Sequence, residues 1–247
     1  MIANPNQPDD QDAAPDDGAS AHARGSFFGR RKGHKLRNHQ ADLIDNLLPH
    51  LALDIGGGPA PGNLTELFDD GAANVRLEIG FGGGEHLIAE AQAFPHTGFI
   101  GCEPYVNGMA KILTQIEALN IRNIRLYAGD AAELLAWAPP QSMARIDLIH
   151  PDPWPKRRHW KRRFVQDATV AAMARIIKSG GEFRFVSDID DYCAWTLAHL
   201  LRSPDFFWTA ERADDWRKPW DGYTMTRYGR KAEREGRVAA YLRFRRV

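Results

Sequence analysis

The stretch NVRLEIGFGGGEHLIAEAQAF, residues 74–94, decides the fold. Val75, Leu77 and Ile79 alternate with polar residues, a pattern typical of a β-strand. Glycines follow at positions 80, 82, 83 and 84, and a helical pattern begins at Glu85. A strand, a glycine-rich turn and a helix in this order predict a βα unit whose turn lies against a ligand.

Strand and helix patterns continue to alternate along the chain. Further strands are expected at residues 97–103, 121–129, 144–153 and 182–188, and helices at 105–120, 130–138, 164–181 and 191–203. This alternation predicts an α/β protein with a mostly parallel sheet and helices on both faces. Residues 205–212 and 239–247 are expected to add two further strands.

The first 72 residues are organised differently from the rest. Residues 1–23 are rich in Asp and Pro and are expected to form a disordered acidic tail. Residues 24–72 are interpreted as a basic segment, an amphipathic helix ending near Pro49, and a linker containing Gly56–Gly58. That glycine run is assigned to the linker because Pro-Ala-Pro, not a helix, follows it. The main domain is expected at 73–247.

Charge is strongly segregated in a chain whose formal net charge is zero. Residues 24–37, 156–163 and 227–246 hold 20 of the 32 Lys and Arg residues. Together they would form a basic face for a polyanion; apart, they would be three solvated surfaces. Two Cys residues, no signal peptide and no long apolar run predict a cytoplasmic protein without a metal site, a disulfide or a membrane span.

Acidic residues follow three of the predicted strands near the glycines. Gly80, Gly82 and Gly84 do not match a dinucleotide fingerprint, because Glu85 stands where its third glycine belongs. Glu103 could accept two ribose hydroxyls or be a solvated strand-end residue. Asp130 could accept from an adenine amine, cap a helix, or do both.

The stretch HPDPWPKRRHWKRR, residues 150–163, follows the fourth predicted strand. Its prolines restrict the backbone around Asp152 and Trp154. Trp154 could stack on a base and Asp152 could accept from the edge of a guanine, or both could belong to a structural turn. Six Lys and Arg residues follow and could bind phosphates.

The acids and glycines, in this order, resemble the class I S-adenosylmethionine-dependent methyltransferases. That resemblance implies a seven-stranded sheet whose last strand is antiparallel. PDPWPKRRHWKRRFVQ, with SFFGRRKGHKLRNHQ, SDIDDY and TRYGRKAEREG, more narrowly resembles the bacterial tRNA (guanine-N7-)-methyltransferases from about residue 25 onward. This resemblance implies S-adenosylmethionine as the cofactor and methylation of a variable-loop guanine in tRNA, by a monomer or homodimer with no obligatory protein partner.

The resemblance also implies residue roles. Asp152 would be the catalytic residue and would line the cofactor site. The other implied cofactor residues are Glu78, Gly80, Gly82, Gly84, Glu103 and Asp130. Substrate contacts are implied for Lys156, Asp188, Thr226, Arg227, Tyr228 and Gly229. RNA contacts are implied for Arg158, His159, Trp160, Lys161, Arg162 and Arg163.

One position departs from the family pattern. Gly229 stands where the family usually has a glutamate, so any contact made by that carboxylate is lost or moves to Glu233 or Glu235. Two other functions stay open at this point. An amino-group methyltransferase would use an Asp-Pro-Pro-aromatic motif, which this sequence lacks, and a non-catalytic RNA-binding protein would not need the acids at 78, 103, 130 and 152.

Overall fold

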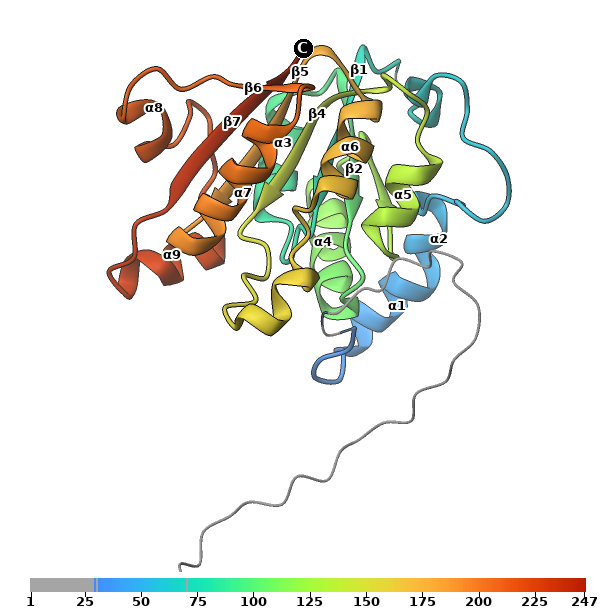
Figure 1. Ribbon diagram of the computed structural model, residues 1–247. Coiled ribbons are helices and arrows are strands. Elements are labelled where there is room, and N and C mark those ends of the chain that lie inside the picture. The colour runs from blue at the N-terminus through green and yellow to red at the C-terminus, as the bar shows by residue number, and fades with distance from the viewer. Residues whose placement is uncertain (1–28, 30, 70) are drawn as a thin grey trace, which may run out of the picture.

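The computed structural model describes residues 29, 31–69 and 71–247, and the expected acidic tail lies outside this range. In the described residues, seven strands form one sheet in the order β3-β2-β1-β4-β5-β7-β6 (Figure 1). β7 is antiparallel to β5 and β6, and the other pairings are parallel. The predicted mostly parallel sheet with an antiparallel last strand is therefore confirmed.

The strands follow the predicted order along the chain. Their bounds are β1 Asn74–Ile79, β2 Thr97–Cys102, β3 Ile124–Tyr127, β4 Met143–Ile149, β5 Ile177–Ser187, β6 Phe206–Trp208 and β7 Ala240–Arg246. In β1, Val75 and Leu77 are fully buried in one core, whereas Arg76 and Glu78 point to the opposite face, where they contact α3. This alternation is the one that the sequence pattern of β1 predicts.

Helices cover both faces of the sheet (Figure 1). The α-helices are α1 Asn38–Asn46, α2 Leu48–Leu51, α3 Glu85–Ala93, α4 Val106–Leu119, α5 Ala131–Trp137, α6 Asp167–Ile176, α7 Asp190–Arg202, α8 Asp214–Arg217 and α9 Arg227–Arg234. The 3-10 helices are η1 Leu64–Leu67 and η2 Arg157–Arg162. α3 and α4 share one core with α1, while α5, α6 and α7 pack on the other face.

The expected amphipathic N-terminal helix is confirmed as α1, which ends at Asn46, three residues before Pro49. Leu43 is buried against α4, and His39 Nε2 lies 2.8 Å from Glu117 Oε2 on the same helix. The glycine run after α2 has no helix or strand, as expected. Leu53 and Leu64 at its ends are nonetheless buried, so this linker packs against the domain.

Two boundaries differ from the sequence prediction. The helix expected at 164–181 ends at Ile176, because Ile177 already pairs with Met143 of β4 as the first residue of β5. The sequence patterns predict no helix between residues 212 and 239, but α9 begins there at Arg227. Its N-terminus is capped by Thr226, whose hydroxyl accepts a hydrogen bond from Gly229 N. α9 has few buried residues, so apolar periodicity could not indicate it.

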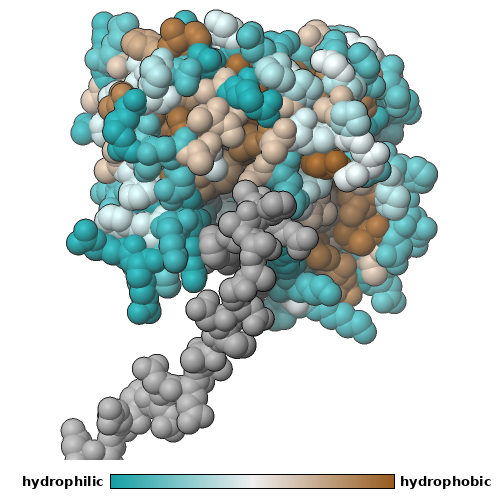
Figure 2. Space-filling model, turned by 45° about the vertical axis from the view of Figure 1, so that its right-hand side comes forward, coloured by the Kyte–Doolittle hydropathy of each residue, from teal (hydrophilic) through white to brown (hydrophobic). Residues whose placement is uncertain are grey.

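The visible face in Figure 2 is mostly hydrophilic, with apolar side chains in small separate patches. Exposed large apolar residues such as Leu201 and Phe207 are ordinary on protein surfaces when they occur singly. Across the residues that the structure describes, the helices are too short or too polar to cross a membrane.

A tight approach between α4 and the glycine loop gives a test of the fold. A Cβ added at Gly108 would lie 2.4 Å from the carbonyl oxygen of Gly82, which is a backbone atom. Helix propensity alone would make Gly108→Ala stabilising by about 1 kcal/mol. We expect the opposite: a lower melting temperature and an S-adenosylmethionine affinity weakened at least tenfold, measured by calorimetry.

Gly62→Ala is the control, because no atom lies within 4 Å of the added Cβ there. It should leave both quantities unchanged. Unchanged cofactor affinity in Gly108→Ala would show that the loop does not need this close contact.

Candidate active site

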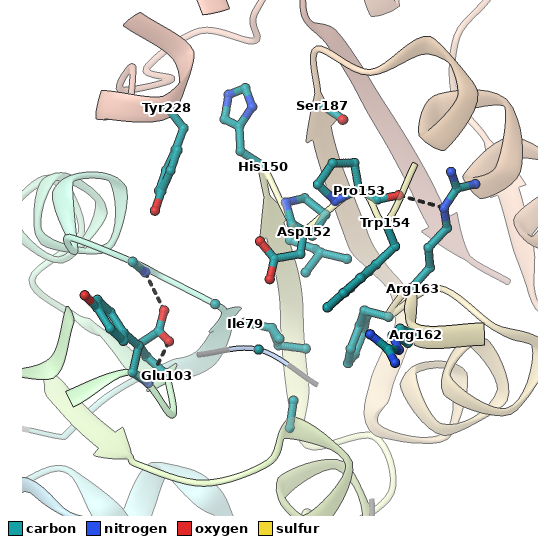
Figure 3. Close-up of a pocket in the computed structure, with 18 of the residues that line it drawn as sticks. Ile79, Glu103, His150, Asp152, Pro153, Trp154, Arg162, Arg163, Ser187 and Tyr228 are labelled. Atoms are coloured by element: carbon teal, nitrogen blue, oxygen red, sulfur yellow. Dashed lines mark hydrogen bonds between the residues drawn. The ribbon is translucent and has the colours of Figure 1, made fainter. Parts of the chain in front are cut away.

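A cavity of about 770 Å³ opens where β1, β2, β4 and β5 end (Figure 3). This is the edge at which open α/β sheets bind ligands. The predicted site residues that line the cavity are Gly80, Gly82, Glu103, Asp130, Asp152, Lys161, Arg162, Arg163, Asp188, Arg227 and Tyr228. The size suits one small molecule and part of a second.

Gly80 and Gly82 form one wall of the cavity with Glu103. Both glycines have positive φ angles, 70° and 58°, which glycine adopts without strain. The Glu103 carboxylate accepts hydrogen bonds from Gly82 N at 2.8 Å and Tyr105 N at 3.0 Å. Burial raises the pKa of Glu103, although these hydrogen bonds oppose the shift. Two bonds leave further lone pairs on this carboxylate for a ligand.

Of the three remaining predicted cofactor residues, Asp130 lines the cavity, whereas Gly84 and Glu78 do not. Asp130 lines the cavity and caps α5, because its carboxylate accepts from Ala132 N at 2.9 Å. Gly84 packs against Ile112 of α4 instead of facing the cavity. Glu78 does not line the cavity either; its buried carboxylate accepts from His86 Nδ1 at 2.7 Å.

The chain leaves β4 through a constrained turn that carries Asp152. His150 and Trp154, each of which precedes a proline, have positive φ angles of 50° and 43°. Such angles are uncommon for residues other than glycine and often occur at functional sites. Asp152 and Trp154 both lie along the cavity, on the same side of the sheet as Gly80 and Gly82 (Figure 3).

The Asp152 carboxylate has no hydrogen-bond or ion-pair partner among residues 29, 31–69 and 71–247. Asp152 is an exposed residue that lines the cavity, and partial burial of its carboxyl raises the pKa of that group. An unpaired acid facing a cavity is an acceptor available to a ligand.

The second and third basic segments supply cations to this one cavity, and the first adds a glycine. The cavity lining includes Gly29 from the first segment, Lys161 and Arg162 from the second, and Arg227 and Lys231 from the third. Lys156, Arg157 and Arg158 are exposed beside it, whereas His159 and Trp160 are half-buried. A basic rim therefore surrounds the cavity of a chain with zero net charge.

Arg163 lies inside the protein, in contrast to its neighbours. Its side chain is fully buried, with the guanidinium carbon about 5 Å from the ring centres of Trp160, Tyr192 and Trp195. Its Nε donates to the carbonyl of Pro153 at 2.9 Å, and the same guanidinium pairs with Asp191. This placement favours a role in holding the Asp152 turn over the RNA contact implied by the resemblance.

Three of the predicted substrate residues, Asp188, Arg227 and Tyr228, also line the cavity. Asp188 accepts from His150 Nδ1 at 3.1 Å and from Arg237 Nε at 2.5 Å. Burial alone would raise the pKa of Asp188, but these two bonds outweigh it and the pKa lies below its usual value. Tyr228 extends over the glycine loop, 3.4 Å from where a Cβ of Gly82 would be.

Other predicted contacts are indirect in this structure. Thr226 is buried and caps α9, and Gly229 is also buried. Lys156 is exposed but does not line the cavity.

Sequence reasoning missed three residues of this region. His150 and Arg237 hold Asp188, and both line the cavity. Asn107 fastens the basic N-terminal segment to α4: it accepts from Gly33 N at 2.8 Å and donates to the carbonyl of His34 at 2.7 Å. These contacts join residues more than 35 positions apart, so no local pattern could have indicated them.

Comparisons with known proteins agree with the fold. A family described as "Putative methyltransferase" matches residues 72–242. The crystal structure of the 16S rRNA methyltransferase KamB aligns with a TM-score of 0.54 at 15% identity, over 74% of this chain and 91% of that one. At this identity the likeness shows the fold, and fold and site together define a class I methyltransferase whose cofactor is S-adenosylmethionine.

Curated relatives narrow this class. A tRNA (guanine-N(7)-)-methyltransferase of Bradyrhizobium diazoefficiens is 81% identical over 221 residues, 90% of this chain and 93% of that protein. One from Nitrobacter hamburgensis is 70% identical over 249 aligned residues, 100% of this chain and 97% of its own length. The chain belongs to the tRNA (guanine-N(7)-)-methyltransferase family.

The burial of Arg163 can be tested against its neighbour Arg158. Arg163→Met should lower the free energy of unfolding by about 3 kcal/mol, because the buried aromatic cage and Pro153 lose their cation. Arg158→Met should change it by less than about 0.5 kcal/mol, since Arg158 is exposed. Urea unfolding measures both. Equal stability of the two variants would contradict the structural role of Arg163.

Proposed function

We propose that this protein transfers a methyl group from S-adenosylmethionine to N7 of a guanine in the variable loop of tRNA, with Asp152 orienting the base. One observation carries the proposal: the unpaired Asp152 carboxylate lies across one cavity from Glu103 and the bare backbone of Gly80 and Gly82. The cavity thus offers a cofactor wall and a separate acid for the acceptor base.

The cofactor wall suits the chemistry of S-adenosylmethionine, which supplies an electrophilic methyl on a sulfonium. Gly80 and Gly82 have no side chains to keep a ligand from the backbone, and Glu103 keeps acceptor capacity for ribose hydroxyls. Asp130 lies further along the same wall, where it could accept from an adenine amine. Of these four residues, Glu103 and Asp130 are acids and the two glycines carry no charge. This combination suits a positively charged cofactor.

Asp152 would act on the guanine without removing a proton from the reacting atom. Guanine N7 carries a lone pair and no proton, so its attack on the methyl needs orientation more than a strong base. The purine gains positive charge as N7 is alkylated. A carboxylate accepting from N1–H and the amino group stabilises that charge, and Trp154 offers a plane for stacking.

Asp152→Asn should lower turnover at least about a hundredfold while S-adenosylmethionine affinity changes only a few-fold, because the acid acts mainly on the charge that develops in the transition state. Burial raises the Asp152 pKa, so the acid is lost earlier as pH falls. Wild-type activity should therefore decline on acidification, whereas the residual activity of Asp152→Asn should lack this decline. Labelled cofactor with unmodified tRNA measures both.

Aniline cleavage of the product locates 7-methylguanosine. A tRNA carrying 7-deazaguanine at that position should not be methylated. Methylation of the deaza substrate would instead indicate an exocyclic amine as the acceptor, and turnover of Asp152→Asn within a few-fold of wild type would remove the role given to this residue.

The basic rim is proposed to bind the phosphates of the tRNA. If Arg158 contacts one phosphate, Arg158→Gln should reduce the slope of log affinity against log salt by about 0.7 to 0.9. Arg122→Gln is the matched control, because Arg122 is exposed near the start of β3, at the opposite edge of the sheet from the cavity. Filter binding over a salt series should leave the control slope unchanged; an equal loss in both variants would contradict a local contact.

A further inference from the structure

Behind the glycine loop, on the side away from the cavity, lies a buried group of charged residues. Its members are Arg76 and Glu78 of β1, His86 and Glu90 of α3, and Arg145 and Asp147 of β4. Glu90 accepts from Arg76 and Arg145, and Arg145 Nε donates to Asp147 at 2.7 Å. Burying charges is costly unless they are paired, so this arrangement has to be close to neutral.

Glu78 and His86 occupy a particular place in this group. Glu78 is the last polar residue of β1 and His86 is the second residue of α3, so the glycine loop begins and ends between them. His86 Nδ1 and Glu78 Oε2 are 2.7 Å apart, and the side chains are 0% and 5% exposed. This one contact therefore joins the two ends of the loop that forms the cofactor wall.

The charge balance couples the state of His86 to that of Glu78. Glu78, Glu90 and Asp147 supply three negative charges, while Arg76 and Arg145 supply two positive ones. The third positive charge comes from His86 if its ring is protonated. From neighbouring elements, Glu182 and Arg184 of β5 pair with each other, and Tyr223, a neutral phenol, lies 5.8 Å from the His86 ring. With Glu78 ionised, the group is neutral when His86 is an imidazolium. Burial raises the pKa of Glu78, and the charge and hydrogen bond of His86 oppose that shift.

The carboxylates around the ring favour its protonated form. Glu78 is bonded to Nδ1, and an oxygen of Glu90 lies 4.0 Å from Nε2, which has no hydrogen-bond partner among the described residues. Burial lowers the pKa of His86, but the charge and hydrogen bond of Glu78 outweigh that effect and the pKa is raised to about 9. Neither ring nitrogen faces the cavity, which His86 and Glu78 do not line.

We propose that His86, as an imidazolium bonded to Glu78, is a positioning residue for the cofactor. The His86–Glu78 contact, called the clasp below, joins the two ends of the glycine loop. Glu78 then contributes to cofactor binding through His86 and not by touching the ligand. This inference rests on the cofactor wall proposed above, but not on the identity of the methylated base.

The pH dependence follows from the direction of the His86 shift. A histidine whose folded pKa lies above its unfolded value of about 6.5 stabilises the fold fully below that value. The contribution disappears as pH rises through about 9. The clasp should therefore loosen, and cofactor affinity should fall, on the alkaline side.

The variant His86→Asn tests the clasp in the full-length protein. The asparagine amide can donate to Glu78 from a similar position but carries no charge. We expect S-adenosylmethionine to bind wild type about tenfold more weakly above pH 9 than at pH 7. His86→Asn should already bind about tenfold more weakly at pH 7, and its affinity relative to wild type should recover as the pH rises. Calorimetry measures each affinity.

His199→Asn is the matched control. His199 also pairs with a carboxylate, Asp167, at 2.6 Å, but it lies on α7 and outside the cavity lining. This variant should keep the wild-type affinity and its pH dependence. Wild-type affinity in His86→Asn at pH 7, or an equal loss in both variants, would overturn the proposal.

Glu78→Gln and the double variant separate indirect from direct action. If Glu78 acts through His86, the double variant should bind no more weakly than the weaker single variant. Additive losses would show that Glu78 contacts the cofactor itself. If the variants do not fold, NMR titration of His86 in wild type replaces them: a midpoint near 9 supports the clasp, and a midpoint near 6.5 overturns it. None of these readouts requires tRNA, so a failure here is distinct from failure of the proposed reaction.

Discussion

The buried guanidinium of Arg163 makes the contacts on which the Asp152 side of the cavity depends. It donates to the carbonyl of Pro153 and packs between the rings of Trp160, Tyr192 and Trp195. Through these contacts the turn after β4 is fixed to η2 and to α7 at once. The backbone angles of His150 and Trp154 are unfavourable in isolation, and they persist because surrounding contacts determine them. Asp152 can therefore be held in place without a bond to its own carboxylate.

Two kinds of charge arrangement serve the same site. Cations from two distant segments, 156–163 and 227–246, lie around the cavity at the surface, where water screens them and a polyanion can replace their counterions. Behind the glycine loop, the charges are buried and paired. Removing one of them would therefore destabilise the local fold, and it would have little effect on the long-range attraction of a polyanion. The zero net charge of the whole chain hides both arrangements.

The fold was predictable to the extent that apolar periodicity carries it. β1, β2, β3 and β4 alternate or form apolar runs, and glycines and acids follow them, so the sheet and the cavity edge could be inferred from local pattern. The family motif then indicated most residues at that edge. α9 could not be inferred this way, because its buried side is formed by the small residues Gly229 and Ala232 and its start is fixed by the Thr226 cap.

Residue roles were less predictable than residue positions. Arg162 and Arg163 are the same letter in the same basic run, yet one lines the rim and the other is buried, because the 3-10 helix turns successive side chains to different sides. Glu78 and Glu103 both follow the acid pattern of the family. Their side chains lie on different faces, since strand residues alternate and the loop after β2 turns Glu103 toward the glycines.

The position of β7 has a consequence for synthesis on the ribosome. β7 is the last strand in the sequence, yet it lies between β5 and β6 and supplies the pairing of both. A nascent chain that has emerged only as far as β6 therefore has an unpaired edge on β5 and no partner for β6. α9, which carries Tyr228 to the cavity, directly precedes β7. The sheet and the part of the cavity lined by Tyr228 can therefore be completed only late in translation, after β1, β2 and the glycine loop have emerged.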